Sequence, residues 1–153
     1  MQLTFDTSIR LLSKLVVIAT LLLIFAGALI KSHEVGLSVP DWPTSYGKQM
    51  FSFPLSEMVG GIFYEHGHRV FATIVGFLTL VLAVLIGFSN QPQWVKKTSL
   101  LALMLVVCQG LLGGMTVLYF LPPPISILHG ILAQTFFALT IFISYSQSKI
   151  RTK

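Results

Sequence analysis

Four long apolar runs constrain this sequence more than any other feature. They cover about residues 9–30, 63–88, 99–120 and 125–145, and each reaches the roughly 20 residues that a helix needs to cross the apolar core of a bilayer. Over the whole chain 54% of the residues are hydrophobic and only 10% are charged, which excludes an ordinary soluble domain. The sequence therefore predicts an all-α integral membrane protein, a single domain over residues 1–153 built as a four-transmembrane-helix bundle.

The first run has a second interpretation. Arg10 and Lys14 precede an apolar stretch that ends in small residues, and this pattern also fits a secretory signal. We favour a retained helix, because the run is long enough to span a membrane and keeps the number of helices even.

Residues 31–62 form the one long polar segment between the runs. Its prolines, glycines and serines exclude a spanning helix. Trp42, Phe51 and Phe53 predict that it folds against the membrane face, because aromatic rings favour that boundary. Loops of this length are often lids or binding loops.

The positive charges predict the orientation. The net charge is +5, but the basic residues stand at the ends of the apolar runs instead of forming one patch, so nucleic-acid binding is not expected. By the positive-inside rule both termini are cytoplasmic and residues 31–62 form an outer loop of a multi-pass protein of the cell (plasma) membrane. Seven of the ten basic residues lie on the predicted cytoplasmic side: Arg10, Lys14, Lys96, Lys97, Lys149, Arg151 and Lys153.

A polar cluster stands at the entrance of the second run. Glu65, His68 and Arg69 have the spacing i, i+3 and i+4, so they share one face of a helix. Ionisable groups at a membrane helix are costly unless they pair, face the bundle interior or bind a ligand. A functional site is therefore one interpretation; the other is a plain helix entrance, with Arg69 reaching toward lipid headgroups.

A second histidine favours the functional interpretation. His129 lies about one turn into the fourth run, as His68 does in the second, and a small residue follows each at i+4, Ala72 and Ala133. Two neutral imidazoles at equal depth on parallel helices are what axial ligation of a haem iron requires. Zinc is the weaker alternative, because its sites usually have three or four ligands. His66 lies on another face of the helix and is a weaker candidate.

Several motifs together resemble the haem A synthase family. The resemblance extends from about residue 27 to residue 137, and the chain matches one of the two tandem four-helix halves that members of this family usually carry. It is therefore similar to a half-length form. The motifs that carry the resemblance are Gly36-Leu37-Ser38, Pro40-Asp41-Trp42-Pro43, Glu65-His66-Gly67-His68-Arg69, Gln109-Gly110 with Leu112-Gly113-Gly114-Met115-Thr116-Val117, and Leu121-Pro122-Pro123 followed by His129.

The resemblance implies an activity and a role for each site residue. The family is an oxidoreductase group that acts on a methyl group of haem O, oxidising it to a formyl group and giving haem A for terminal oxidases. His68 and His129 match the axial ligands of the haem iron, and Glu65 matches the carboxylate linked to methyl oxidation. Arg69 matches a basic residue that could hold a haem propionate. Haem O is then the substrate, and haem B is a candidate bound cofactor.

The same resemblance implies partners and shows one departure. A haem O synthase, an unidentified electron partner and a second copy of the chain are the expected partners, besides membrane lipid. Many members carry a cysteine pair in the outer loop, but this loop has Ser38 and Ser45 where thiols are expected, so it cannot form that disulfide.

Two other classes stay open: a b-type cytochrome that only carries electrons, and a haem-handling membrane protein without enzymatic activity. A small transporter is not expected, because the runs show no broken helix or charge at mid-membrane.

Overall fold

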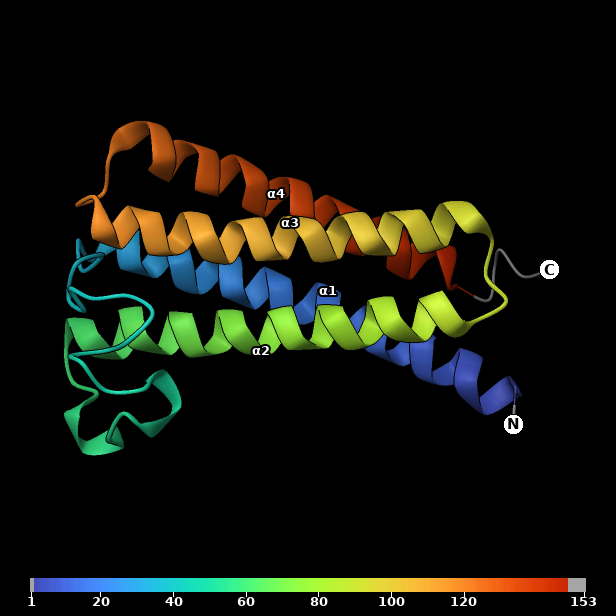
Figure 1. The fold of residues 1–153 in the computed structure, drawn as a ribbon, viewed down its shortest axis with the longest axis horizontal. Helices are drawn as coiled ribbons and strands as arrows, with labels where there is room; N and C mark the ends of the chain where they lie inside the picture. Colours follow the sequence, from blue (N-terminus) through green and yellow to red (C-terminus); the bar gives the residue numbers. More distant parts are fainter. Residues whose placement is uncertain (1, 149–153) are drawn as a thin grey trace.

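The protein, in a computed structural model that describes residues 2–148 with side chains from Asp6 onward, is a bundle of four long helices (Figure 1). Two short 3-10 helices, η1 (Met50–Ser52) and η2 (Leu55–Glu57), lie in the long loop. Within the described residues, four helices are long and apolar enough to cross a membrane, which confirms the expected fold class of a multi-pass membrane protein. These helices are α1 (Gln2–Ser32), α2 (Gly61–Phe88), α3 (Gln93–Leu118) and α4 (Pro123–Ser146).

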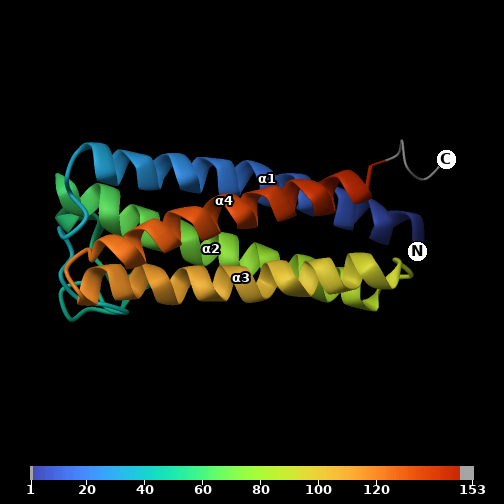
Figure 2. The same cartoon turned by 90° about the horizontal axis from the view of Figure 1, so that it is seen from above.

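The order of packing places α2 and α4 diagonally across the bundle. Each helix packs against the next in the chain, and α4 packs back against α1, so the four form a ring in cross-section (Figures 1 and 2). α2 and α4 both begin at the end where the long loop folds, which we call the loop end. α1 begins and α4 ends at the opposite end, which we call the terminal end.

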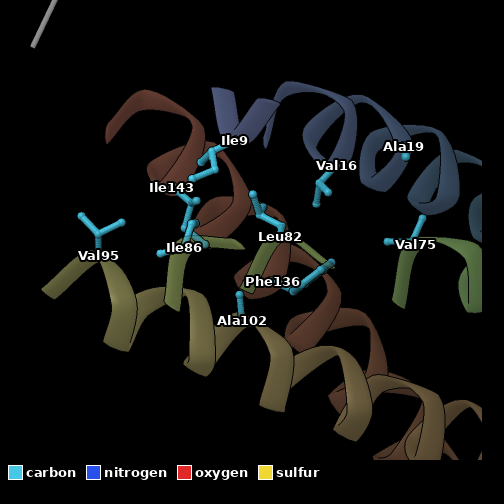
Figure 3. Close-up of a cluster of buried hydrophobic side chains, with 10 residues drawn as sticks. All are labelled: Ile9, Val16, Ala19, Val75, Leu82, Ile86, Val95, Ala102, Phe136 and Ile143. Carbon is cyan, nitrogen blue, oxygen red and sulfur yellow. The ribbon is translucent and has the colours of Figure 1, made fainter. Parts of the chain in front are cut away.

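The apolar core occupies the half of the bundle toward the terminal end. Its members come from all four helices (Figure 3). Toward the loop end, the buried apolar residues of the described chain are Val39 and Phe53 from the loop and Val117 from α3. Aliphatic packing between the helices is thus concentrated in the terminal half. The buried cluster of the terminal half consists of Ile9, Val16, Ala19, Val75, Leu82, Ile86, Val95, Ala102, Phe136 and Ile143.

Two helices extend beyond their expected ranges. α1 begins at Gln2 instead of residue 9, and α3 begins at Gln93 instead of residue 99. Residues 93–97, which lie between the second and third apolar runs, are therefore helical. Pro92 precedes this helix, and Lys96 Nζ donates a hydrogen bond to the Gly87 carbonyl at 2.9 Å. The lysine stem can lie along the helix while its ammonium stays at the surface, so the charge did not require a break.

The other helix ends agree with the expected ranges to within two residues, the usual uncertainty of such boundaries. Three basic residues of the orientation argument, Lys149, Arg151 and Lys153, lie outside the described residues.

Candidate functional site

The first element of the site is a buried ion pair on α2. Arg69 Nη2 lies 2.6 Å from Glu65 Oε1, one helical turn earlier, and the two side chains are only 10% and 5% exposed. Glu65 Oε2 accepts a second hydrogen bond, from the backbone N–H of Val39 in the loop, at 2.9 Å. Both carboxylate oxygens therefore accept a hydrogen bond, and the one from Arg69 is charge-assisted.

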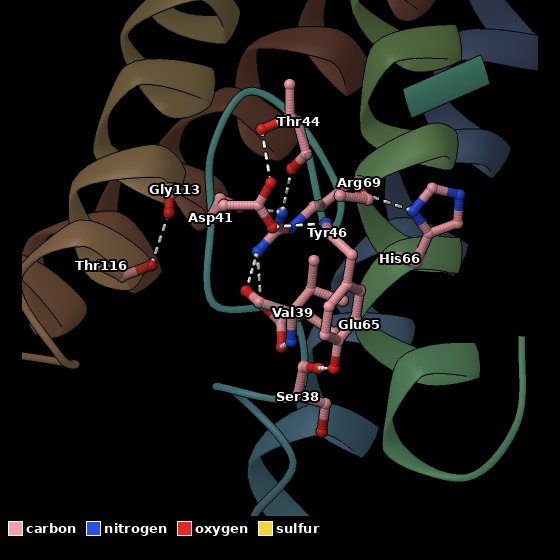
Figure 4. Close-up of polar contacts among 11 residues, drawn as sticks. Ser38, Val39, Asp41, Thr44, Tyr46, Glu65, His66, Arg69, Gly113 and Thr116 are labelled. Carbon is pink, nitrogen blue, oxygen red and sulfur yellow. Dashed lines mark hydrogen bonds and ion pairs between the residues drawn. The ribbon is translucent and has the colours of Figure 1, made fainter. Parts of the chain in front are cut away.

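Arg69 also binds the backbone of the loop. Its Nη1 donates to the carbonyl oxygens of Asp41 at 2.6 Å and Thr44 at 3.2 Å, and its Nη2 donates to the carbonyl of Val39 at 2.7 Å (Figure 4). The guanidinium therefore joins the entrance of α2 to a loop segment 25 to 30 residues earlier in the chain. This geometry excludes the plain alternative in which Arg69 extends toward lipid headgroups.

Asp41 closes the turn that Arg69 binds. Its carboxylate accepts hydrogen bonds from the Thr44 hydroxyl at 2.5 Å, the Tyr46 N–H at 2.7 Å and the Gly47 N–H at 2.9 Å. Burial acts to raise the pKa of Asp41, but these hydrogen bonds outweigh it, and the pKa is lowered from its ordinary value. The ionised side chain thus acts as the centre of a compact turn.

The same turn brings Trp42 onto α3. A Cβ atom placed on Gly114 would lie 2.5 Å from two atoms of the Trp42 indole, so only glycine leaves space for the ring here. The segment around Trp42 therefore packs against the loop end of the bundle, whereas Phe51 is 63% exposed.

His66 belongs to the attachment of the loop. It is buried, its Nδ1 lies 2.8 Å from the Ser45 hydroxyl, and its ring lies 4.7 Å from that of Phe53. Ser45, where the resemblance led us to expect a thiol, is itself fully buried. The ring of His33, immediately after the end of α1, stacks on that of Tyr64 with centroids 4.9 Å apart.

His68 and His129 are the second element of the site. They lie near the starts of α2 and α4, the diagonal helices. Each ring packs on a glycine of the preceding helix. A Cβ on Gly27 of α1 would lie 3.2 Å from His68 Cε1, and a Cβ on Gly113 of α3 would lie 3.3 Å from His129 Cε1. The two halves of the bundle thus repeat one arrangement.

The Nδ1 atoms of both histidines are buried without a hydrogen-bond partner, as is Oε1 of Gln109 on α3. Unpartnered polar atoms in a protein interior are uncommon and require an explanation. Two neutral imidazoles on facing helices, each beside a glycine and outside the apolar core, fit the ligand set of a haem iron.

The structure brings together the four residues expected from the sequence in two groups. Glu65 and Arg69 contact each other and the loop, while His68 and His129 pack on glycines of α1 and α3 with buried Nδ1 atoms. The sequence argument missed Gly27 and the backbone of Val39. A glycine within an apolar helix was the available signal for the first, whereas a backbone group leaves no signal in the sequence.

Comparison with known proteins gives the family. Residues 47–152 match a family described as cytochrome oxidase assembly protein. The chain is similar to the haem A synthase of Shewanella oneidensis, with 30% identity over 77% of this chain and 39% of the relative. It is also similar to the haem A synthase of Listeria welshimeri, with 24% identity over 99% of this chain and 48% of the relative.

The chain thus spans less than half the length of these curated relatives. No solved structure matches the chain. The family match covers more than half of the sequence and includes both His68 and His129, so it confirms the family resemblance. By this match, the chain belongs to the family of cytochrome oxidase assembly proteins that includes the haem A synthases.

Proposed function

We propose that this chain acts as a haem A synthase, an oxidoreductase that converts a pyrrole methyl group of haem O to a formyl group. The observation that supports this most strongly is the pair His68 and His129, two imidazoles with unpartnered Nδ1 atoms on diagonal helices of a protein from this family. In the proposal these two residues would hold the haem iron. The bound haem supplies the iron and the methyl group that is oxidised.

Glu65 is the proposed catalytic residue. Oxidation of a methyl group withdraws electrons from its carbon, so positive charge develops there, and a nearby carboxylate stabilises it. The contacts from Arg69 and Val39 hold the Glu65 carboxylate in place. This arrangement favours charge stabilisation over proton uptake, because neither oxygen is free of a donor.

The proposal extends to location and partners. Both termini face the cytoplasm of a plasma-membrane protein, the loop end faces outward, and an electron partner takes up the electrons. A haem O synthase supplies the substrate. Two copies of the chain associate, which brings together as many helices as the two tandem halves of the longer family members.

The test is to express the chain with a haem O supply, purify it in detergent and identify the extracted haems by chromatography and mass spectrometry. Haem A or its hydroxylated precursor, measured per bound haem, should accumulate with the wild type and not with Glu65→Gln. If only haem B is extracted and the purified protein has a low-spin spectrum, the result would instead favour an electron-carrying b-type cytochrome. Full conversion by Glu65→Gln would refute the role of this carboxylate.

A further inference from the structure

The hydrogen-bonding capacity of Arg69 is almost fully used within the protein. A guanidinium has five N–H donors, two on each Nη and one on Nε. Nη1 donates to the carbonyls of Asp41 and Thr44, and Nη2 donates to Glu65 and to the carbonyl of Val39. No Nη donor is left for a paired contact with a propionate. A haem propionate could bind Arg69 in that way only by displacing the loop.

Glu65 completes the attachment. Glu65 accepts a hydrogen bond from the N–H of Val39, and Arg69 donates one to the carbonyl of the same residue. The ion pair therefore binds both backbone polar groups of one fully buried loop residue. Charge-assisted hydrogen bonds in a buried site are stronger than neutral ones. The ion pair therefore anchors the loop at one point from two sides.

The anchored segment carries Trp42 between two of its attachment points. Arg69 binds the carbonyls of Asp41 and Thr44 on either side of the indole, which packs on Gly114. The neighbouring residue, Gly113, supports the ring of His129. The position of the loop thus determines where the indole lies beside the candidate haem ligand.

We propose that Arg69 is a positioning residue: it holds residues 38–46 over the loop end of the bundle, orients Glu65 and places Trp42 as a wall of the site, instead of binding a propionate. The role of Trp42 in enclosing a ligand rests on the proposed function. The hydrogen bonds that attach the loop to Arg69 and Glu65 do not depend on haem.

The first arm of the test is hydrogen–deuterium exchange of the full chain in detergent without added haem. Arg69→Gln removes the charge, and Arg69→Lys keeps it but loses the planar fork that spans several carbonyls. Exchange of residues 38–47 should rise in both variants, on the order of 10- to 100-fold, the effect of losing charge-assisted hydrogen bonds. The control is Lys48→Gln, which removes a half-exposed ion pair with Glu57 in the same loop and should change exchange little.

The second arm compares binding of haem B with that of its dimethyl ester, which has no propionate charge. If Arg69 positions the loop, Arg69→Lys weakens binding of both by the same factor and alters the haem absorption spectrum of both. If Arg69 binds a propionate, the wild type prefers the free acid, only free-acid binding is weakened by the variants, and loop exchange is unchanged. That combination would overturn the inference. If the wild type binds neither haem, the proposed function fails, while the exchange arm still decides the role of Arg69.

Discussion

The contact between Trp42 and Gly114 gives a sharp prediction for Gly114→Ala. Carbon atoms in contact lie about 3.5–4.0 Å apart, whereas the new Cβ would lie 2.5 Å from the indole. The ring must therefore move by about 1 Å or more. It cannot do so freely, because Arg69 holds the residues on both sides of it through Asp41 and Thr44.

The magnitude follows from comparison with Gly110→Ala, one turn earlier on α3, where a Cβ meets no atom within 4 Å. Both variants gain about 0.8–1.0 kcal/mol of helix propensity. Only Gly114→Ala carries the overpacking cost of about 1–3 kcal/mol. Because the propensity gain is common to both, the free energies of unfolding should differ by about 1–3 kcal/mol, with Gly114→Ala the less stable.

The assay is reversible unfolding in mixed detergent micelles, followed by fluorescence in a Trp94→Phe background so that Trp42 is the sole tryptophan. The emission of folded Gly114→Ala should also shift, since the indole leaves its contact with α3. Equal stability of the two alanine variants, with unchanged emission, would refute the described packing of the loop.

Three further predictions concern the loop and the histidine support. Gly27→Ala should displace the His68 ring by a few tenths of an ångström, since its Cβ would lie 3.2 Å from Cε1, and shift the haem spectrum at unchanged protein yield; an identical spectrum would contradict this support. Asp41 has a lowered pKa, so its contribution to the stability of the loop is present above pH ~4 and is lost as the pH falls through the lowered value. Hydrogen exchange of the loop should therefore depend on acid in the wild type, and Asp41→Asn should abolish this dependence. A pH profile of exchange that is unchanged in Asp41→Asn would count against it. Lys48→Ala should change the free energy of unfolding by about 0.5 kcal/mol or less, because the Lys48–Glu57 pair is half-exposed. A larger loss of stability would mean that the pair anchors the loop.

The helices and the depth of the two histidines could be predicted because they depend on local properties of the sequence. Apolar runs of spanning length require helices, since a bilayer provides no hydrogen-bond partners for an open backbone. The positions of His68 and His129 near the starts of two such runs then placed both at one end. The sequence therefore indicated the fold class and the candidate ligand pair.

The attachment of the loop could not be predicted, because its acceptors are backbone carbonyls. Arg69 was expected to contact a propionate or lipid, yet it binds groups of Val39, Asp41 and Thr44 that any residue would supply. Which carbonyls turn toward the guanidinium depends on the path of the loop.

The start of α3 was misplaced for a different reason. Lys96 and Lys97 resemble a turn in composition, but a lysine can lie on a helix with its charge at the surface.

The most direct test of the central claim is the electron paramagnetic resonance spectrum of the purified chain loaded with ferric haem. Axial ligation by His68 and His129 predicts a low-spin signal of the two-imidazole type, which both His68→Ala and His129→Ala should convert to high spin. His66→Ala is the matched control and should leave the signal low-spin, because His66 bonds Ser45 in the loop. A low-spin signal that persists in either the His68 or the His129 variant would contradict the proposed haem site.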